Sequence, residues 1–181
     1  MKVLILNGGV NSPSIDSSIQ DLKHKLSDKG VETGELILNE MKYSPCRGCF
    51  NCWVKTPGLC VFRDDGDVLC REVLHSDFIL LASPVIMGYP SALLKNALDR
   101  IIPLIHPYLE DIEGEVHHMK RYSKYPVMGL LLEKSGDTDD EDINIITEIF
   151  QRAALNLQSR LSFVKFTTAQ AEETAYEIIN N

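Results

Sequence analysis

The segment FILLASPVIMGYPSALLKNALDR, residues 78–100, carries the clearest indication of the fold class. It opens with FILLA at 78–82, a continuous apolar run with the length of a strand that is buried on both faces. A loop containing Pro and Gly follows at 83–90, and apolar residues then recur at helical spacing from Leu93 to Ile102, which predicts a helix that ends near Pro103. A buried strand, a loop and an amphipathic helix form one unit of a parallel α/β sheet.

The same alternation extends over the whole chain. Four more strand-like apolar runs occur at 2–6, 31–38, 127–132 and 161–166. Helical periodicity predicts further helices around 15–26, 66–74, 143–157 and 169–179. Continuous apolar strands that alternate with amphipathic helices predict an α/β fold with a doubly wound five-stranded parallel sheet of order 2-1-3-4-5. Because no repeat or linker interrupts this pattern, we expect a single domain over residues 1–181.

The composition fits an ordinary globular protein, with 44% hydrophobic and 24% charged residues. A formal charge of −8 argues against nucleic acid and anionic membranes as partners, because both require a basic surface. No apolar run reaches the ~18 residues of a membrane span, and we expect a soluble cytoplasmic protein. Five cysteines without a secretory signal indicate a reducing compartment.

Two loops are candidates for ligand binding. In a doubly wound sheet, ligands bind beyond the carboxyl ends of the strands where the strand order reverses, here between the first and third strands. The loop after the first strand offers glycines for close backbone approach and hydroxyl donors near a helix N-terminus, a combination that suits phosphate. Its candidate residues are Gly8, Gly9, Ser12, Ser14, Ser17 and Ser18. The alternative is an ordinary N-cap formed by Ser12-Pro13, with Asp16 satisfying the helix end.

The loop after the third strand offers polarizable and aromatic surfaces and a tight backbone that can hold the edge of a planar ring. Its candidate residues are Pro84, Val85, Ile86, Met87, Gly88 and Tyr89. As a bare pattern, the loop is equally compatible with a structural turn.

Residues 83–100 resemble the flavin-loop-and-helix signature of the NAD(P)H-dependent FMN reductases and multimeric flavodoxins. The resemblance follows the element order over most of the chain and is closest in 45–65 and 83–100. It implies a flavodoxin-like fold, FMN on the two loops described above, NAD(P)H as a substrate and an oligomer, usually a dimer or tetramer. The first loop departs from the family pattern, because it lacks an arginine and places Asp16 near the expected phosphate, which the carboxylate would repel.

The segment CRGCFNCWVKTPGLC, residues 46–60, contains Cys46, Cys49, Cys52 and Cys60. Three thiolates at this spacing can enclose one side of a compact cluster while the fourth closes it, as iron–sulfur ligation requires. The segment is similar to the cysteine motif of iron–sulfur flavoproteins, which implies a [4Fe-4S] cluster that exchanges electrons with FMN. Reduced thiols packed under the loop, zinc and a redox disulfide are the alternatives. The turn at Pro57-Gly58 favours packed thiols, because it closes the loop without metal.

Residues 104–125 show no regular periodicity, and we expect an irregular excursion. Here His117 and His118 are expected to meet a cofactor phosphate or a second subunit rather than a metal ion, because adjacent histidines do not share one helix face. The segment contains more apolar and aromatic residues than a solvated loop ordinarily keeps, which predicts a homodimer. These residues are Ile105, Tyr108, Leu109, Ile112, Tyr122 and Tyr125.

The leading functional hypothesis is an FMN-dependent NAD(P)H oxidoreductase that passes electrons to a small-molecule acceptor such as a quinone or free flavin. No catalytic side chain is assigned, because the cofactor performs the difficult chemistry and the protein orients it. One alternative is an iron–sulfur flavoprotein that carries electrons to or from a redox protein. Another is a flavodoxin-shaped binding protein that has lost its affinity for flavin.

Overall fold

The computed structural model describes residues 1–112 and 114–181. Its parallel strands are β1 (Lys2–Asn7), β2 (Glu32–Ile37), β3 (Phe78–Ile86), β7 (Val127–Glu133) and β8 (Leu161–Phe166). They lie side by side in the order β2-β1-β3-β7-β8. The predicted flavodoxin-like α/β fold and its 2-1-3-4-5 strand order are therefore confirmed, with β7 and β8 in the fourth and fifth places.

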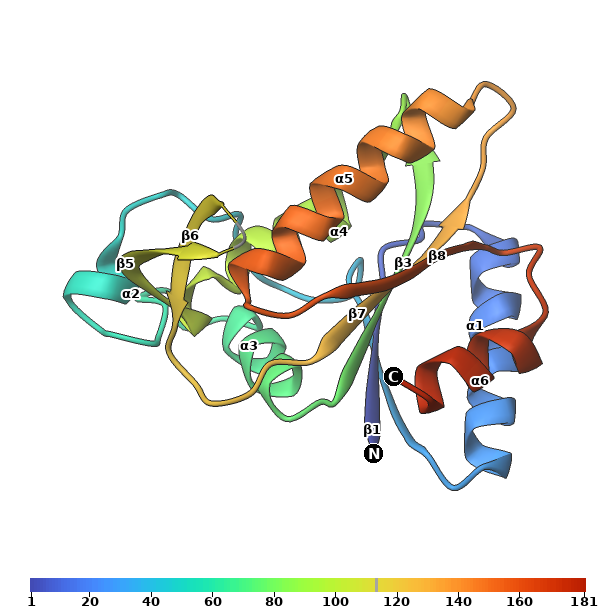
Figure 1. The fold of residues 1–181 in the computed structure, drawn as a ribbon, viewed down its shortest axis with the longest axis horizontal. Helices are drawn as coiled ribbons and strands as arrows, with labels where there is room; N and C mark the ends of the chain where they lie inside the picture. The colour runs from blue at the N-terminus through green and yellow to red at the C-terminus, as the bar shows by residue number, and fades with distance from the viewer. Residues whose placement is uncertain (113) are drawn as a thin grey trace.

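Helices cover both faces of the sheet (Figure 1). Their bounds are α1 (Pro13–Asp28), α2 (Asn51–Val54), α3 (Gly66–Leu74), α4 (Ala92–Arg100), α5 (Asp140–Asn156) and α6 (Ala171–Ile179), with the 3₁₀ helix η1 at Ile102–Leu104. Helices α1 and α6 pack on one face, and α3, α4 and α5 pack on the other. Within the described residues, no helix has the length and apolar character that crossing a membrane requires.

The burial of β1 on both faces explains why its sequence does not alternate between apolar and polar residues. Val3 and Ile5 point into the cluster with α1 and α6, whereas Leu4 and Leu6 point into the cluster with α3, α4 and α5. Successive residues of a strand face opposite sides of the sheet, so a strand that is covered on both sides must be apolar throughout. The continuous apolar runs of the sequence follow from this burial.

Strand β3 is longer than the FILLA run predicts. It continues to Ile86, so the predicted loop at 83–90 is instead a hairpin in which β3 pairs antiparallel with β4 (Tyr89–Pro90). Only Met87 and Gly88 lie between the two strands, with φ angles of 50° and 74°. Two positive φ angles are the signature of a type I′ turn, which glycine favours and methionine does not. Pro84 is a second reason why the sequence did not predict that β3 extends to Ile86, because proline usually marks the end of a strand.

The prediction of an irregular excursion over 104–125 is wrong. Residues Ile105–Ile112 form β5 and Glu115–Lys120 form β6, which pair as an antiparallel two-stranded sheet beside the main one (Figure 1). Charged residues interrupt the apolar alternation of both strands, and the register shifts between Ile105 and Leu109. A strand whose pattern is broken in this way gives little sequence signal.

The new hairpin also corrects two expectations about its side chains. His117 is 5% exposed and its Nδ1 lies 3.0 Å from Asn156 Oδ1 of α5, so it is part of the domain interior and not of a surface. Ile105 and Tyr125 are also buried in the core. Only the outward part of the predicted dimer cluster, chiefly Tyr108 and Leu109, is available for contact with another chain.

Candidate functional site

The structure brings the two predicted binding loops together at the switch point between β1 and β3. Gly8 N donates to Ala82 O at 2.8 Å, and the hydroxyl of Ser91, which caps α4, donates to Gly8 O at 2.7 Å. A Cβ at position 8 would lie 2.8 Å from Ser91 Oγ. Gly8 therefore permits the contact between the two loops, in addition to any approach of a ligand.

The serines of the first loop do not converge on one point. Ser12 is buried, accepts from Ile15 N as the N-cap of α1, and donates to Glu133 Oε2 at 2.5 Å. Ser14 and Ser18 both donate to Thr167, which follows β8. Ser17 is exposed. The N-cap alternative is thus realised by Ser12, although the free backbone N–H groups at this helix end remain the natural place for an anion.

Carboxylates crowd the same edge of the sheet. Asp16 Oδ1 accepts from Asn7 Nδ2 at 3.2 Å, and Glu35 accepts from the same amide at 3.1 Å. Glu133 ends β7 and contacts Ser12. The sequence revealed only Asp16, although Glu133 directly follows a predicted strand and could have been placed at this edge. An anion at the start of α1 would meet these carboxylates, and Lys23 offsets only the charge of Glu35.

The tip of the β3–β4 hairpin is apolar. Ile86 is 54% exposed and Met87 is 92% exposed, whereas Val85 is buried beneath them. Gly88 lies against α5, where a Cβ would stand 2.5 Å from Asp142 Oδ1. Tyr89 is half-buried and lines a separate cavity between α4 and α5. A planar ring that binds here has Ile86 and Met87 as its apolar contact surface.

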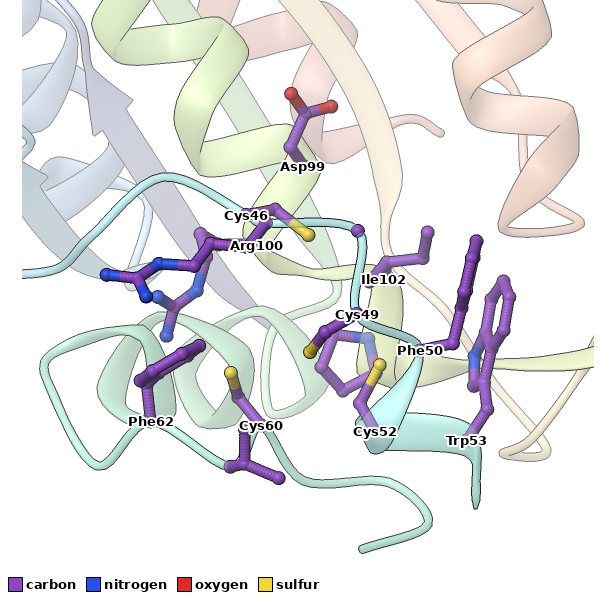
Figure 2. A pocket seen from close by; sticks show the side chains of 14 residues that line it. Cys46, Cys49, Phe50, Cys52, Trp53, Cys60, Phe62, Asp99, Arg100 and Ile102 are labelled. Atoms are coloured by element: carbon purple, nitrogen blue, oxygen red, sulfur yellow. The ribbon is translucent and has the colours of Figure 1, made fainter. Parts of the chain in front are cut away.

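All four cysteines of the 46–60 segment line a single cavity (Figure 2). Their sulfur atoms face the space between Phe62 and the Phe50–Trp53 pair. Positive φ angles at Gly48 and Phe50 turn the chain sharply between the cysteines. Trp53 fixes the loop from the other side, because its Nε1 donates to Ile105 O at 3.0 Å and its ring stacks on Phe50.

The exposure and spacing of the cysteines bear on the alternatives for this segment. Cys46 and Cys49 are exposed, so the interpretation as thiols packed under the loop is wrong for these two. Among the described residues, no three His, Cys, Asp or Glu side chains meet closely enough to hold a metal ion. A four-iron cluster binds each thiolate through a different iron, so its ligands surround a wider space. Burial and the charges of Cys60, Cys46 and Cys49 raise the pKa of Cys52, which disfavours its thiolate form. A bound metal would offset this effect, because the metal binds the thiolate.

A buried ion pair closes the base of the cysteine loop. Arg100, the last residue of α4, donates to both oxygens of Asp64, at 3.0 and 2.5 Å, and to Ser44 O at 2.7 Å. Asp64 also accepts from the backbone N–H of Ser44. Ser44 precedes the first cysteine of the segment and Asp64 follows the last, so the pair holds both ends of the loop on α4. No sequence pattern indicates this contact between residues that are 36 positions apart.

Comparison with known proteins identifies relatives of the chain. The family model described as NADPH-dependent FMN reductase matches residues 1–121. An iron–sulfur flavoprotein of Methanocaldococcus jannaschii is 33% identical over 108 residues, which are 58% of this chain and 53% of that protein. One from Archaeoglobus fulgidus is 36% identical over 98 residues, 54% of this chain and 42% of that protein. The chain thus spans about half the length of the curated relatives that it matches.

Solved structures of low sequence identity share the fold. An azoreductase from Bacillus anthracis superposes with a TM-score of 0.65 at 13% identity, covering 99% of this chain and 93% of that one. A quinone reductase described as putative, from Klebsiella pneumoniae, gives a TM-score of 0.68 at 14% identity, covering 99% of this chain and 83% of that one. At these identities the likeness supports the flavodoxin-like architecture alone.

Cys70 differs from the other four cysteines. It lies on α3, outside the lining of the cysteine cavity, and its thiol donates to Arg100 O at 3.4 Å. Burial is the main cause that raises its pKa to about 12. Since the thiolate is the reactive form, Cys70 should be inert in the folded protein.

Alkylation of metal-free protein tests this distinction. With iodoacetamide at pH 8, Cys46 and Cys49 should react, whereas Cys70 should react about a thousand times more slowly, because so little of a thiol with this pKa is ionised. Peptide mass spectrometry at timed intervals measures each rate. In urea, which removes the burial, all five cysteines should react alike. Comparable labelling of Cys70 and Cys46 in the folded protein would contradict the assignment.

Proposed function

The chain belongs to the NADPH-dependent FMN reductase family, and from this we propose that it is an FMN-dependent oxidoreductase with a [4Fe-4S] cluster on Cys46, Cys49, Cys52 and Cys60. The observation that carries the proposal is the single cavity that these four side chains line. The names of the curated relatives, iron–sulfur flavoproteins, support it. We propose NAD(P)H as the electron donor, because reduced nicotinamide is the substrate of the family.

When bound, FMN would supply the two-electron hydride chemistry and the cluster would supply one-electron transfer. The chain contributes position and surroundings. The N-terminus of α1 offers backbone N–H groups to the FMN phosphate, and Ile86 and Met87 offer an apolar surface to its ring. The 46–60 loop holds the thiols, and Trp53 anchors that loop to β5.

A flavin reductase without a cluster is the second candidate. It is favoured by the protein contacts that already close the cysteine loop, namely the Trp53–Ile105 hydrogen bond and the Arg100–Asp64 pair. Such an enzyme would pass electrons from FMN directly to a small-molecule acceptor. A redox protein is the partner in the cluster-containing case, because a cluster delivers single electrons.

Metal and flavin analysis separates the two candidates. Protein purified anaerobically should contain about four irons and as many acid-labile sulfides per chain, together with FMN. Cys49→Ser should lose the iron, because three thiolates remain where the cluster requires four. Cys70→Ser is the matched control and should retain it, since Cys70 does not line the cavity. Stoichiometric FMN without iron in the native protein would favour the second candidate.

The affinity for FMN should be limited by the carboxylates at the start of α1. Glu133→Gln removes one negative charge while its amide oxygen still accepts from Ser12, so FMN should bind about three to ten times more tightly, as expected for a charge near the surface. Glu32→Gln, an exposed substitution at the opposite edge of the sheet, should leave the affinity unchanged. Fluorescence titration of flavin-free protein measures both. No saturable binding by any form would support the binding-protein alternative.

We also propose a homodimer that uses the exposed apolar side chains of the β5–β6 hairpin. Tyr108, Leu109 and Val116 are 65%, 58% and 68% exposed, an unusual gathering of large apolar side chains on neighbouring strands. Light scattering should give twice the chain mass, and Leu109→Asp should reduce it to the monomer mass because a carboxylate would be buried in the interface. A native protein that remains monomeric at high concentration would exclude the dimer.

A further inference from the structure

Arg100 places a buried positive charge in the wall of the cysteine cavity. Its side chain is 2% exposed, and it lines the cavity together with the four thiols (Figure 2). Removing a guanidinium from water is unfavourable unless hydrogen bonds and an opposite charge compensate. The partners of Arg100 therefore decide how much of its charge remains effective inside the cavity.

Asp64 compensates this charge only in part. Nη1 and Nη2 of Arg100 are used by the Asp64 carboxylate and by Ser44 O. Nε is also buried, and no described residue accepts a hydrogen bond from it. Asp64 itself is 18% exposed, so water screens the carboxylate more than the guanidinium. A cation with one unused donor thus lines the cavity and is screened less than its counter-ion.

The guanidinium is fixed in place. A Cβ at position 66 would stand 2.1 Å from Nη2 of Arg100, so Gly66 at the start of α3 lies directly against it. The Tyr43 ring centroid lies 5.7 Å from its central carbon. These contacts and the hydrogen bonds to Asp64 and Ser44 hold the guanidinium in the cavity wall.

The charge also reaches the cysteines. Burial opposes ionisation of Arg100, but the hydrogen bond to Asp64 and the charges of Cys60, Asp64 and Cys70 outweigh it and hold the pKa of Arg100 above its ordinary value. Arg100 and Cys60 line the same cavity, so the guanidinium charge acts on a group bound there. Arg47, the other cation that lines the cavity, is exposed and stacks on Phe62. Water screens an exposed charge strongly, so Arg100 should exceed Arg47 in its effect.

We propose that the Arg100–Asp64 pair sets the reduction potential of the group held by the four cysteines. This inference rests on the proposed function. One-electron reduction adds a negative charge to that group without changing its thiolate ligands. Arg100 stabilises the added charge and raises the potential, whereas Asp64 opposes the charge and lowers the potential. The two residues therefore tune the potential in opposite directions, although they are partners in one ion pair.

Potentiometric titration of the anaerobic holoprotein, followed by absorption, tests the pair. R100Q should lower the cluster potential and D64N should raise it, each by a change of about tenfold or more in the ratio of oxidised to reduced cluster at a fixed potential. For a one-electron couple, tenfold corresponds to 59 mV. Arg47→Gln, which removes a cation from the exposed part of the same cavity, should change this ratio less than threefold.

A double variant covers the case in which R100Q does not fold, because removing one member of a buried pair leaves the other without its partner. D64N/R100Q keeps polar side chains at both positions and leaves no unpaired charge. Its potential should lie below that of D64N, which isolates the contribution of the Arg100 charge. Iron and sulfide content of every variant, measured beside the potential, shows whether the same cluster is present.

The alternative is that the Arg100–Asp64 pair only holds the cysteine loop in place, and this alternative predicts a different result. If D64N and R100Q shift the potential in the same direction, if the double variant does not fall below D64N, or if R47Q shifts it as much as R100Q, the inference is overturned. Variants that retain the cluster at the native potential overturn it as well and leave the proposed function intact. Native protein without iron and sulfide overturns the proposed function, and this inference with it.

Discussion

The parallel pairing of β1 with β3 positions both candidate binding loops and the helices that follow them. It places the loops after the two strands next to each other, and it directs α1 and α4 to opposite faces of the sheet. The contact is close enough that Gly8 packs against the cap of α4. Without this pairing, the helix N-terminus of α1 and the apolar tip at Met87 would not lie at one sheet edge. The positions of both proposed cofactor sites therefore follow from the pairing of β1 with β3.

The two sites differ in the charged groups around them, which the total charge of −8 conceals. Carboxylates of Asp16, Glu35 and Glu133 lie near the start of α1, whereas two guanidinium groups, Arg47 and Arg100, and one carboxylate, Asp99, line the cysteine cavity. In the proposed function, a flavin phosphate at the first site would meet repulsion, and an anionic cluster at the second would be attracted by Arg47 and Arg100. Charges in a partly buried site are screened less than charges on the surface. Nearby charged groups therefore affect a bound group more than the distant groups that make up most of the net charge.

The sequence predicted the elements whose pattern is set by burial and missed those set by specific contacts. Strand β8 and helix α3 were placed correctly because apolar packing on both faces of the sheet or a helical stripe leaves a strong sequence signal. The β5–β6 hairpin and the extension of β3 were missed, since charged residues, Pro84 and a turn at Met87 break that signal. The four cysteines were recognised by spacing. Arg100 and Glu133 were not, because their roles arise from partners far away in the chain, Asp64 and Ser12.

Helix α4 connects the two sites through a single rigid element. It begins at Ser91, whose hydroxyl binds the loop after β1, and it ends at Arg100, whose guanidinium holds the loop of cysteines. Nine helical residues at about 1.5 Å per residue give a length of about 14 Å. An α-helix of this length does not stretch, so the edge where a flavin would bind and the cavity where the thiols face each other keep a fixed separation. Their relative position is therefore a property of the fold and not of the bound groups.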